Sequence, residues 1–452
     1  MTKVKVADKD KSKNIVSGFS KKSKAEKIAW VVENFLNNDP TAAKELTGFW
    51  HEEADLQKVL DGFSENTLSN FPMPFGVAPN FCINGKVYAV PMVIEESSVV
   101  AAASSAAKFW LSRGGFHAEV RSMTKIGQVH FLYEGNSTHL QQAFATLESE
   151  LRADTQHITA RMEQRGGGIQ SIELLDLTHL EPNYYQLKVA FETCDSMGAN
   201  FINSVLEQFG ATLERFAQSH LPTEVMIIMA ILSNYTPDCI VKAWVECPVE
   251  ALEGACKDMD APTFAQKFHK AIRIAEIDPY RATTHNKGIF NGVDAVVLAT
   301  GNDFRAVEAC GHTHAARDGQ YRSLSQCSIE NGVFTFSMEL PLAVGTVGGL
   351  TKLHPLAKRS LEILGNPTAQ ELMQIIAVTG LAQNFGAIRS LVTTGIQQGH
   401  MKMHLMNILN HLGAKNGAIE ATTAHFEDKA VSFNAVRVFL EEYRTTNSVL
   451  SR

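Results

Sequence analysis

Residues 278–305 contain the densest group of side chains that could do chemistry. Arg281, Lys287, Asn291 and Asp303 stand there among glycines, asparagines and apolar residues, many of which break helices. A buried ammonium group held by a carboxylate can stabilise an oxyanion as it develops at a carbonyl, which is often the largest catalytic effect in a site. Lys287 is therefore a candidate electrophilic group, although a structural lysine–aspartate pair explains the same spacing equally well.

A second candidate is the acidic pair Glu95 and Glu96. Residues 81–93 have the pattern of a strand hairpin with Asn84 and Gly85 at its turn, and residues 97–110 are alanine-rich, so Glu96 falls at a strand-to-helix junction. Desolvation at such a junction could raise the pKa of a carboxyl group and make it a general acid. The residues alone favour the simpler interpretation, in which the two glutamates stabilise a helix N-terminus.

Two histidine pairs could bind a metal. His400 and His404 are four residues apart and would share a helical face, but Met401 replaces the glutamate of the zinc-protease pattern. His312 and His314 alternate as on one face of a strand. We expect an exposed or core-edge position for both pairs, and no metal.

Two glycine-containing segments, residues 195–200 and 345–349, could let the backbone approach a ligand. Neither matches the Gly-x-Gly-x-x-Gly pattern between a strand and a helix, so a Rossmann cofactor site is not indicated. From the residues alone, each is a turn.

The pattern of elements predicts a mixed protein with more than one domain, because 452 residues exceed what one hydrophobic core usually serves. Residues 20–38 have the spacing of an amphipathic helix behind a serine cap. Short strands alternate with helices between residues 128 and 219, which suggests a small α/β or α+β domain. A strand is expected at 333–342 and helices at 395–443.

Composition excludes several classes of protein. The formal net charge of -7 argues against a general nucleic-acid binder. The seven cysteines are odd in number and scattered, which fits a reducing cytosol better than a disulfide framework. The basic N-terminus has no apolar stretch behind it, and the longest apolar run, at 225–232, is too short to cross a bilayer. We expect a cytoplasmic protein without a membrane anchor.

Taken together, these segments resemble the class II (bacterial) hydroxymethylglutaryl-CoA reductases, in order along nearly the whole chain. The matching segments are residues 90–104, 195–200, 231–234, 278–305, 345–349, 381–389 and 395–401. The resemblance implies a four-electron reduction of hydroxymethylglutaryl-CoA to mevalonate and CoA, by two hydride transfers from NADPH or NADH and without a metal.

The resemblance also assigns catalytic roles. Glu96 would protonate the nascent alcohol, and Lys287 would polarise the thioester carbonyl and then the aldehyde carbonyl. Asp303 would hold and tune both groups through a shared hydrogen-bond network. His400, on a hinged flap, would protonate the departing CoA thiolate.

The remaining matched positions fall into two groups. Those that would hold the hydroxymethylglutaryl group are Ser98, Arg281, Asn291 and Asn384, with Arg281 suited to bidentate binding of the free carboxylate. Those that would bind the dinucleotide are Asp195, Met197, Gly198, Asn200 and Asn234. Arg152, Arg161 and Arg165 could meet a 2′-phosphate, and Asp154 a ribose hydroxyl, which tips the expectation towards NADPH.

The implied fold is α+β. A large mixed domain (1–121 and 238–393) would bind the CoA thioester and form the dimer; a small non-Rossmann domain (122–237) would bind the dinucleotide; residues 394–452 would form the flap. The implied assembly is a homodimer with a shared active site, and assembly beyond the dimer is left open. The chain departs from the family at residues 67–69, beside the dimer-forming Glu65 and Asn66, and at Ser97, where the family usually has proline.

Two other functions remain open. One is a metal-dependent hydrolase that uses His400 and His404, which metal analysis would separate from a reductase. The other is a catalytically inactive relative that only binds CoA or a partner, against which the presence of Glu96, Lys287, Asp303 and His400 argues. Cofactor oxidation in the presence of the CoA thioester decides between the three.

Overall fold

The computed structural model describes residues 14–393, 395, 405–406, 408–426, 429 and 431–450. They form two compact units, Met1–Pro74 with Lys352–Pro355, and Phe75–Thr351 with Leu356–Arg452. His400 and His404 lie outside the described residues, so the structure gives no geometry for the expected flap histidine.

The first unit is helical. After a short 3-10 helix (Phe19–Lys21) it contains α1 (Lys24–Phe35), α2 (Ala42–Gly48) and α3 (Ala54–Asp61). Ser23 caps α1 and forms a reciprocal capping box with Glu26, which confirms the predicted serine cap.

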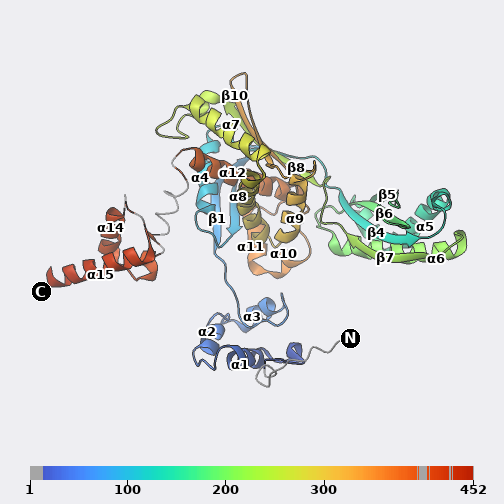
Figure 1. Ribbon diagram of the computed structural model, residues 1–452, viewed down its shortest axis with the longest axis horizontal. Coiled ribbons are helices and arrows are strands. Elements are labelled where there is room, and N and C mark those ends of the chain that lie inside the picture. Colours follow the sequence, from blue (N-terminus) through green and yellow to red (C-terminus); the bar gives the residue numbers. More distant parts are fainter. Residues whose placement is uncertain are drawn as a thin grey trace. The chain divides into compact units, whose positions relative to one another are not determined.

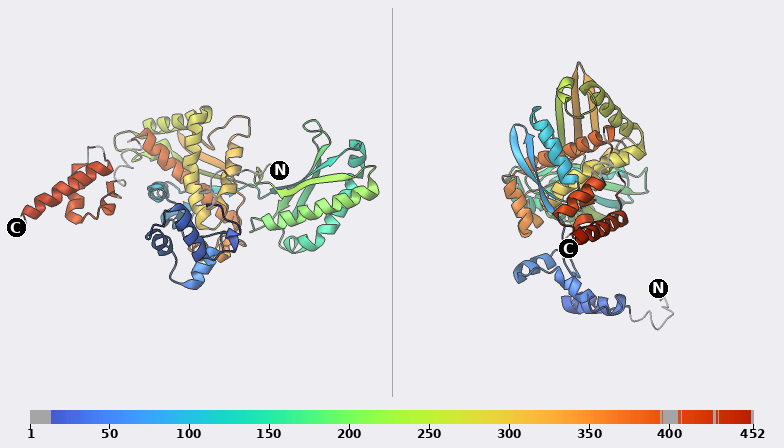
Figure 2. Two further views of the ribbon diagram at one scale, coloured as in Figure 1. Left: turned by 60° about the horizontal axis from the view of Figure 1, so that its bottom comes forward. Right: turned by 90° about the vertical axis from the view of Figure 1, so that its left-hand side faces the viewer.

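The second unit opens with the predicted hairpin of β1 (Phe75–Ile83) and β2 (Lys86–Val93). Asn84 and Gly85 both have positive φ, 49° and 82°, as a two-residue hairpin turn requires. The hairpin packs against α4 (Val99–Leu111), which lies beside the two strands in Figure 2. Five residues separate β2 from α4, so Glu96 does lie at a strand-to-helix junction.

Residues 125–232 form an antiparallel sheet in the order β5-β6-β4-β7, with α5 and α6 packed on one of its faces (Figure 1). The elements are β4 (Lys125–Tyr133), α5 (Ser137–Glu163), β5 (Gly168–Asp176), β6 (Tyr184–Glu192), α6 (Ala199–His220) and β7 (Val225–Leu232). A separate core that includes Val129, Leu187 and Phe209 fills the space between helices and sheet. Because every strand pair is antiparallel, this is not a Rossmann sheet, as the glycine pattern indicated.

A second antiparallel sheet has the order β3-β8-β10-β9. Its strands are β3 (His117–Val120), β8 (Ile240–Pro248), β9 (Ser325–Glu330) and β10 (Val333–Pro341). The largest hydrophobic core joins this sheet to the helices α4, α7 (Ala261–Ile277), α8 (Pro279–Ala299) and α12 (Ala369–Val392).

Helix α8 corrects one expectation. Residues 278–305 contain many helix-breaking residues, yet Pro279–Ala299 is one continuous helix of 21 residues. Asp278 caps it by accepting from the backbone N–H of Tyr280, and Pro279 occupies its first turn, where a missing N–H has no cost. Gly292 is needed for packing, since a Cβ there would come within 2.8 Å of the Gln383 side chain of α12.

Helix α12 is long and apolar enough to cross a membrane, but 72% of its apolar window is buried within the structure. It contacts α4, α7 and α8. Burial of this kind is what the central helix of a protein core requires.

Several further elements belong wholly or in part to the second unit. They are a 3-10 helix (Val249–Leu252), α9 (Phe304–Ala315), α10 (Leu350–Leu353), α11 (Pro355–Ile363), α14 (Asn416–His425) and α15 (Phe433–Leu450). Helices α14 and α15 belong to a small core of their own that includes Leu409, Phe426 and Leu440. All seven cysteines are free, as expected, and the α+β fold class is confirmed. The three proposed domain boundaries stay a prediction.

Candidate active site

The structure brings Lys287 and Glu96 together. The Lys287 Nζ lies 2.7 Å from the Glu96 Oε2, and the Asn291 Nδ2 donates to the same oxygen at 3.4 Å. Lys287 and Asn291 are four residues apart on α8 and share its face, while Glu96 approaches from the junction before α4. One carboxylate oxygen therefore meets an ammonium and an amide donor.

This ion pair is less enclosed than the sequence suggested. The Lys287 side chain is 60% exposed and that of Glu96 36% exposed. The expected buried ammonium is thus wrong for the single chain, because nothing in the described part of the chain covers this face of α8. A substrate or another copy of the chain would have to exclude water from it.

Ser98 stands next to the pair at the start of α4. Its φ of 78° is left-handed, which is costly for a residue with a Cβ, and its side chain makes no capping hydrogen bond. The local strain leaves its hydroxyl uncommitted to the helix, as a substrate-binding group requires.

Arg281 lies six residues, about 1.7 turns, before Lys287 on α8. At 100° per residue, the side chains of Arg281, Asn291 and Lys287 fall within an arc of about 120°. Arg281 is half-buried, which lowers the pKa of its guanidinium group. No carboxylate lies within salt-bridge distance of it in the described chain, so the guanidinium is available to an anion.

A buried network that the sequence did not reveal supports this helix. The His285 Nε2 lies 2.7 Å from the Ser325 hydroxyl, which donates to the Asn384 Oδ1 at 2.8 Å. Burial, and then the nearby Arg281, lower the pKa of His285 to about 3, so its ring is neutral. Asn384 was expected to bind substrate, but it is buried and holds α12 to α8 through Ser325. The one signal in the sequence was the spacing of His285, which follows Arg281 by four residues and so lies near it on the helix.

Asp303 is not at the Lys287 ammonium. It caps α9 by accepting from the backbone N–H groups of Arg305 and Ala306, and its two oxygens also accept from the Arg305 guanidinium at 3.0 and 2.9 Å. The hydrogen bond from the Arg305 side chain lowers the pKa of this carboxyl group and outweighs burial, which raises it. Because α8 continues from Lys287 to Ala299 before the chain turns, the two side chains are separated by roughly 18 Å of helix. The expected shared network does not form within one chain.

Another carboxyl group on α8 does have a strongly shifted pKa. Burial, and then the negative charge of Glu308 on α9, raise the pKa of Asp294 to about 8. The Asp294 Oδ1 is buried and has no hydrogen-bond partner in the described structure. Asp294 therefore keeps its proton at neutral pH.

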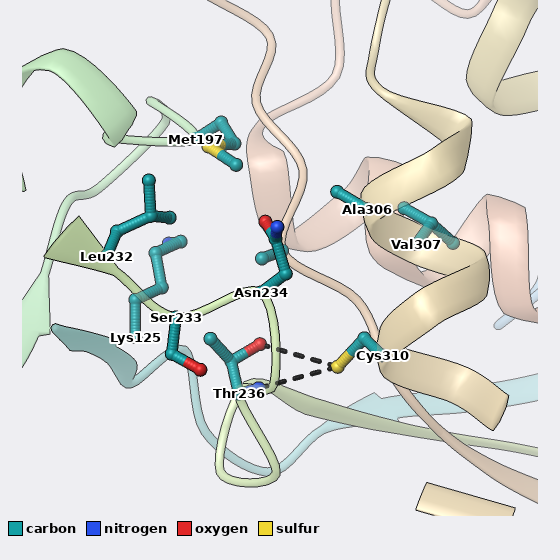
Figure 3. A pocket seen from close by; sticks show the side chains of 10 residues that line it. Lys125, Met197, Leu232, Ser233, Asn234, Thr236, Ala306, Val307 and Cys310 are labelled. Carbon is teal, nitrogen blue, oxygen red and sulfur yellow. Dashed lines mark hydrogen bonds between the residues drawn. The ribbon is translucent and has the colours of Figure 1, made fainter. Parts of the chain in front are cut away.

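The expected cofactor residues gather at the start of α6 and the end of β7. Met197 and Asn234 line one pocket together with Lys125, Leu232 and Ser233 (Figure 3). Its enclosed part measures only about 10 Å³, close to the room of one water molecule, and beyond that the pocket opens to solvent. Its opposite wall comes from α9, through Ala306, Val307 and Cys310.

Gly198 and Asn200 lie at the N-terminus of α6. Gly198 has a φ of 94°, and a Cβ there would come within 2.5 Å of the Thr193 side chain, so glycine is required. No side chain caps the helix, and its first turn holds no acidic residue. Asn200 is exposed in that first turn. An uncapped helix N-terminus offers free N–H groups to an anion.

Asp195 has a different position. Its Oδ1 accepts from the backbone N–H of Ala369, the first residue of α12, at 2.7 Å. The glycine turn at 345–349 packs on the same segment, since Thr346 N donates to Asp195 O and a Cβ on Gly345 would come within 2.4 Å of Met197 N. The two glycine segments, separate turns in the sequence, are thus one structural feature.

Two of the four charged residues considered for cofactor preference, Asp154 and Arg152, are already paired. Asp154 accepts from the Thr212 hydroxyl at 2.6 Å and from Arg215 at 2.7 Å, and both hydrogen bonds lower its pKa. Arg152 donates to Glu148. Neither pairing favours a direct role at the ribose or its phosphate.

The histidines at 312 and 314 are on helix α9, so the expectation of a strand was wrong. Two residues apart on a helix, they point in different directions: His312 lies 2.7 Å from the Tyr321 hydroxyl, and His314 is buried. Among the residues that the structure describes, no group of three or more histidine, cysteine or carboxylate side chains could hold a metal ion.

Comparisons with known proteins give this arrangement a family. The sequence matches the family model described as hydroxymethylglutaryl-coenzyme A reductase over residues 24–405. It is 34% identical to the 3-hydroxy-3-methylglutaryl-coenzyme A reductase of Archaeoglobus fulgidus over 406 residues, which cover 90% of this chain and 89% of that protein. It is 32% identical to a probable reductase of the same name from Borreliella burgdorferi, over 81% of this chain and 82% of that protein.

Solved structures agree. The class II reductase of Streptococcus pneumoniae, bound to NADPH in open conformations, matches with a TM-score of 0.69 and 38% identity over 84% of this chain and 100% of its own. Another structure of the Streptococcus pneumoniae reductase matches with a TM-score of 0.70 and 36% identity over 95% of this chain and 100% of its own. With the ordered motifs and the Glu96–Lys287 pair, these matches confirm the expected family: the chain belongs to the hydroxymethylglutaryl-coenzyme A reductases of class II.

Proposed function

We propose that the chain reduces (S)-3-hydroxy-3-methylglutaryl-CoA to (R)-mevalonate and CoA, with two equivalents of NADPH or NADH. The observation that carries the proposal is the contact between Lys287 and Glu96 at 2.7 Å. It places an ammonium group, which can stabilise an oxyanion, beside a carboxyl group, which can carry a proton, and the reduction of a carbonyl to an alcohol needs both.

Lys287 would stabilise the negative charge on the carbonyl oxygen of the thioester and then of the aldehyde. Glu96 would deliver a proton to that oxygen, and Asn291 would keep the carboxyl group oriented. Arg281 and Ser98 would hold the free carboxylate and the hydroxyl of the substrate. His400, outside the described residues, would protonate the CoA thiolate.

The cofactor segment fits a dinucleotide. The uncapped N-terminus of α6, which begins after the left-handed Gly198, offers N–H donors to a phosphate-bearing ligand, and Met197 just before it lines a pocket together with Asn234. When bound, NAD(P)H supplies the hydride. The NADPH in the Streptococcus pneumoniae structure supports the lean towards NADPH.

The shared active site also belongs to this proposal. Asp303 lies roughly 18 Å of helix away from Lys287 in the same chain, whereas the Lys287 face of α8 is exposed. A homodimer in which Asp303 of one copy meets Lys287 of the other would supply the missing carboxylate and cover the ion pair. The domain roles given above, and a cytoplasmic location suggested by the free cysteines, complete the proposal.

The test is an assay of the purified full chain with hydroxymethylglutaryl-CoA and each nicotinamide, following cofactor oxidation and free CoA thiol in parallel. We expect two cofactors oxidised for each thiol released, with mevalonate as the product. Thiol release without cofactor oxidation would instead identify a hydrolase. Binding of CoA with neither reaction would identify a non-catalytic relative.

A further inference from the structure

Lys125, the first residue of β4, is a buried cation without a countercharge among the residues that the structure describes. Its side chain is only 1% exposed. Its ammonium makes one long hydrogen bond, 3.5 Å to the carbonyl of Met123, although it carries three donors. No carboxylate in the described chain lies within salt-bridge distance. Burying an unpaired ammonium costs roughly several kcal/mol of folding free energy. We therefore expect a negatively charged partner from outside the described chain.

The neighbouring carboxylates are occupied elsewhere. Glu192 accepts from the backbone N–H of Cys194 at 2.8 Å, and Asp195 accepts from the backbone N–H of Ala369 at 2.7 Å. Burial, and then the negative charges of Glu192 and Asp195, raise the pKa of the Cys194 thiol, whereas the charge of Lys125 lowers it. Neither carboxylate forms an ion pair with Lys125. The countercharge must therefore come from outside the described chain.

The ammonium points into the pocket between Met197 and Asn234. Figure 3 shows the Lys125 side chain extending from β4 towards these two residues, with Leu232 and Ser233 beside it. Helix α6 begins two residues after Met197, with an uncapped N-terminus and no acidic residue in its first turn. The buried ammonium thus lines the pocket, and a positive helix N-terminus follows directly after Met197, another residue of the pocket wall.

We propose that the Lys125 ammonium is the countercharge for a phosphoryl group of the nicotinamide dinucleotide. The proposal rests on the cofactor site proposed above and adds a residue that the sequence motifs did not indicate. A phosphoryl oxygen satisfies both the charge and the unused donors of the ammonium, whereas the neutral nicotinamide carboxamide satisfies only the donors. The pyrophosphate and the 2′-phosphate are the two sources of this chemistry.

The test compares the wild-type chain with Lys125→Met, which keeps the length of the side chain without its charge. Lys188→Met, at a partly exposed lysine of the neighbouring strand β6, is the matched control. Dissociation constants are measured by calorimetry for NADPH, NADH and ADP-ribose, which has the pyrophosphate but no nicotinamide. The melting temperature is measured without ligand.

We expect Lys125→Met to weaken NADPH roughly tenfold to hundredfold, as the loss of a charge-assisted hydrogen bond predicts, and Lys188→Met to leave it unchanged. The melting temperature without ligand should stay the same or rise, because an unpaired buried charge is removed. If Lys125→Met weakens the binding of ADP-ribose and NADH as much as that of NADPH, the lysine contacts the pyrophosphate. If it weakens the binding of NADPH alone, the lysine contacts the 2′-phosphate.

Three results would overturn the proposal. One is an NADPH dissociation constant for Lys125→Met within twofold of wild type. Another is weaker binding of both NADPH and NADH with unchanged ADP-ribose binding, which would move Lys125 to the nicotinamide half. The third is a lower melting temperature with unchanged affinity, which would make the lysine structural.

Two further measurements keep these results interpretable. If Lys125→Met does not fold, Lys125→Arg must retain the affinity within a few fold, and a larger loss in that variant would also reject the countercharge. Failure of the wild-type chain to bind either dinucleotide would reject the proposed cofactor site itself, and is thereby distinguished from failure of Lys125.

Discussion

The Lys287 ammonium lies 2.7 Å from the Glu96 carboxylate, although 191 residues separate them in the chain. Neither residue was distinctive by itself. Their contact depends on α8 packing against the β1–β2 hairpin, which ends just before Glu96. This contact gives the first prediction.

Glu96→Gln and Lys287→Ala should each lower kcat by about 10²–10⁴-fold, because each removes a group that acts on the reacting carbonyl oxygen. Both side chains are partly exposed, so the melting temperature should barely change. Steady-state rates measure the effect, with Lys270→Ala on α7 as an exposed lysine control. Either variant turning over at the wild-type rate would remove that residue from the mechanism.

Arg281→Lys should raise the KM for hydroxymethylglutaryl-CoA by roughly tenfold or more, since lysine keeps the charge but loses the planar fork that binds a carboxylate through two hydrogen bonds. The KM for the nicotinamide should not change. Arg273→Lys, at an exposed arginine paired with Glu276, serves as the control. An unchanged substrate KM would place the carboxylate elsewhere.

Co-expression of the Lys287→Ala and Asp303→Asn chains tests the shared site. In a mixed dimer, one site would receive an intact lysine from one copy and an intact aspartate from the other. Random pairing should therefore restore about a quarter of the wild-type activity, from two chains that are inactive alone. If each chain carried its own complete site, the mixture would stay inactive.

Asp294→Asn should increase stability in a pH-dependent way. Because burial and Glu308 raise the pKa of Asp294 from 3.8 to about 8, the folded chain keeps a proton that the unfolded chain loses across this range. Stability contributed by this group therefore falls as the pH rises through the window. Asparagine stays neutral at every pH. The gain in the free energy of unfolding from Asp294→Asn, measured by urea denaturation, should therefore be larger at pH 8 than at pH 5. Asp258→Asn, at an exposed aspartate, should show no such difference.

Much of the local structure followed from short patterns. The Asn84-Gly85 turn predicted the hairpin because few residues accept two consecutive positive φ angles. The absence of a Rossmann glycine pattern agreed with the antiparallel sheet at 125–232. The pattern failed at 278–305. Glycine weakens a helix in water, but Gly292 lets α8 approach α12 closely, since a Cβ there would come within 2.8 Å of Gln383.

By itself, the sequence determined the family, the kind of reaction and the identity of the groups that could perform it, because motif order and residue chemistry are properties of the chain alone. Tertiary structure decided which groups meet. It joined Glu96 to Lys287, set Asp303 apart as the cap of α9, buried Asn384 behind Ser325 and aimed Lys125 into a pocket. Those outcomes depend on contacts between helices that are far apart in the sequence. The distance between two charged groups and their burial set the strength of their interaction, and residue types alone give neither.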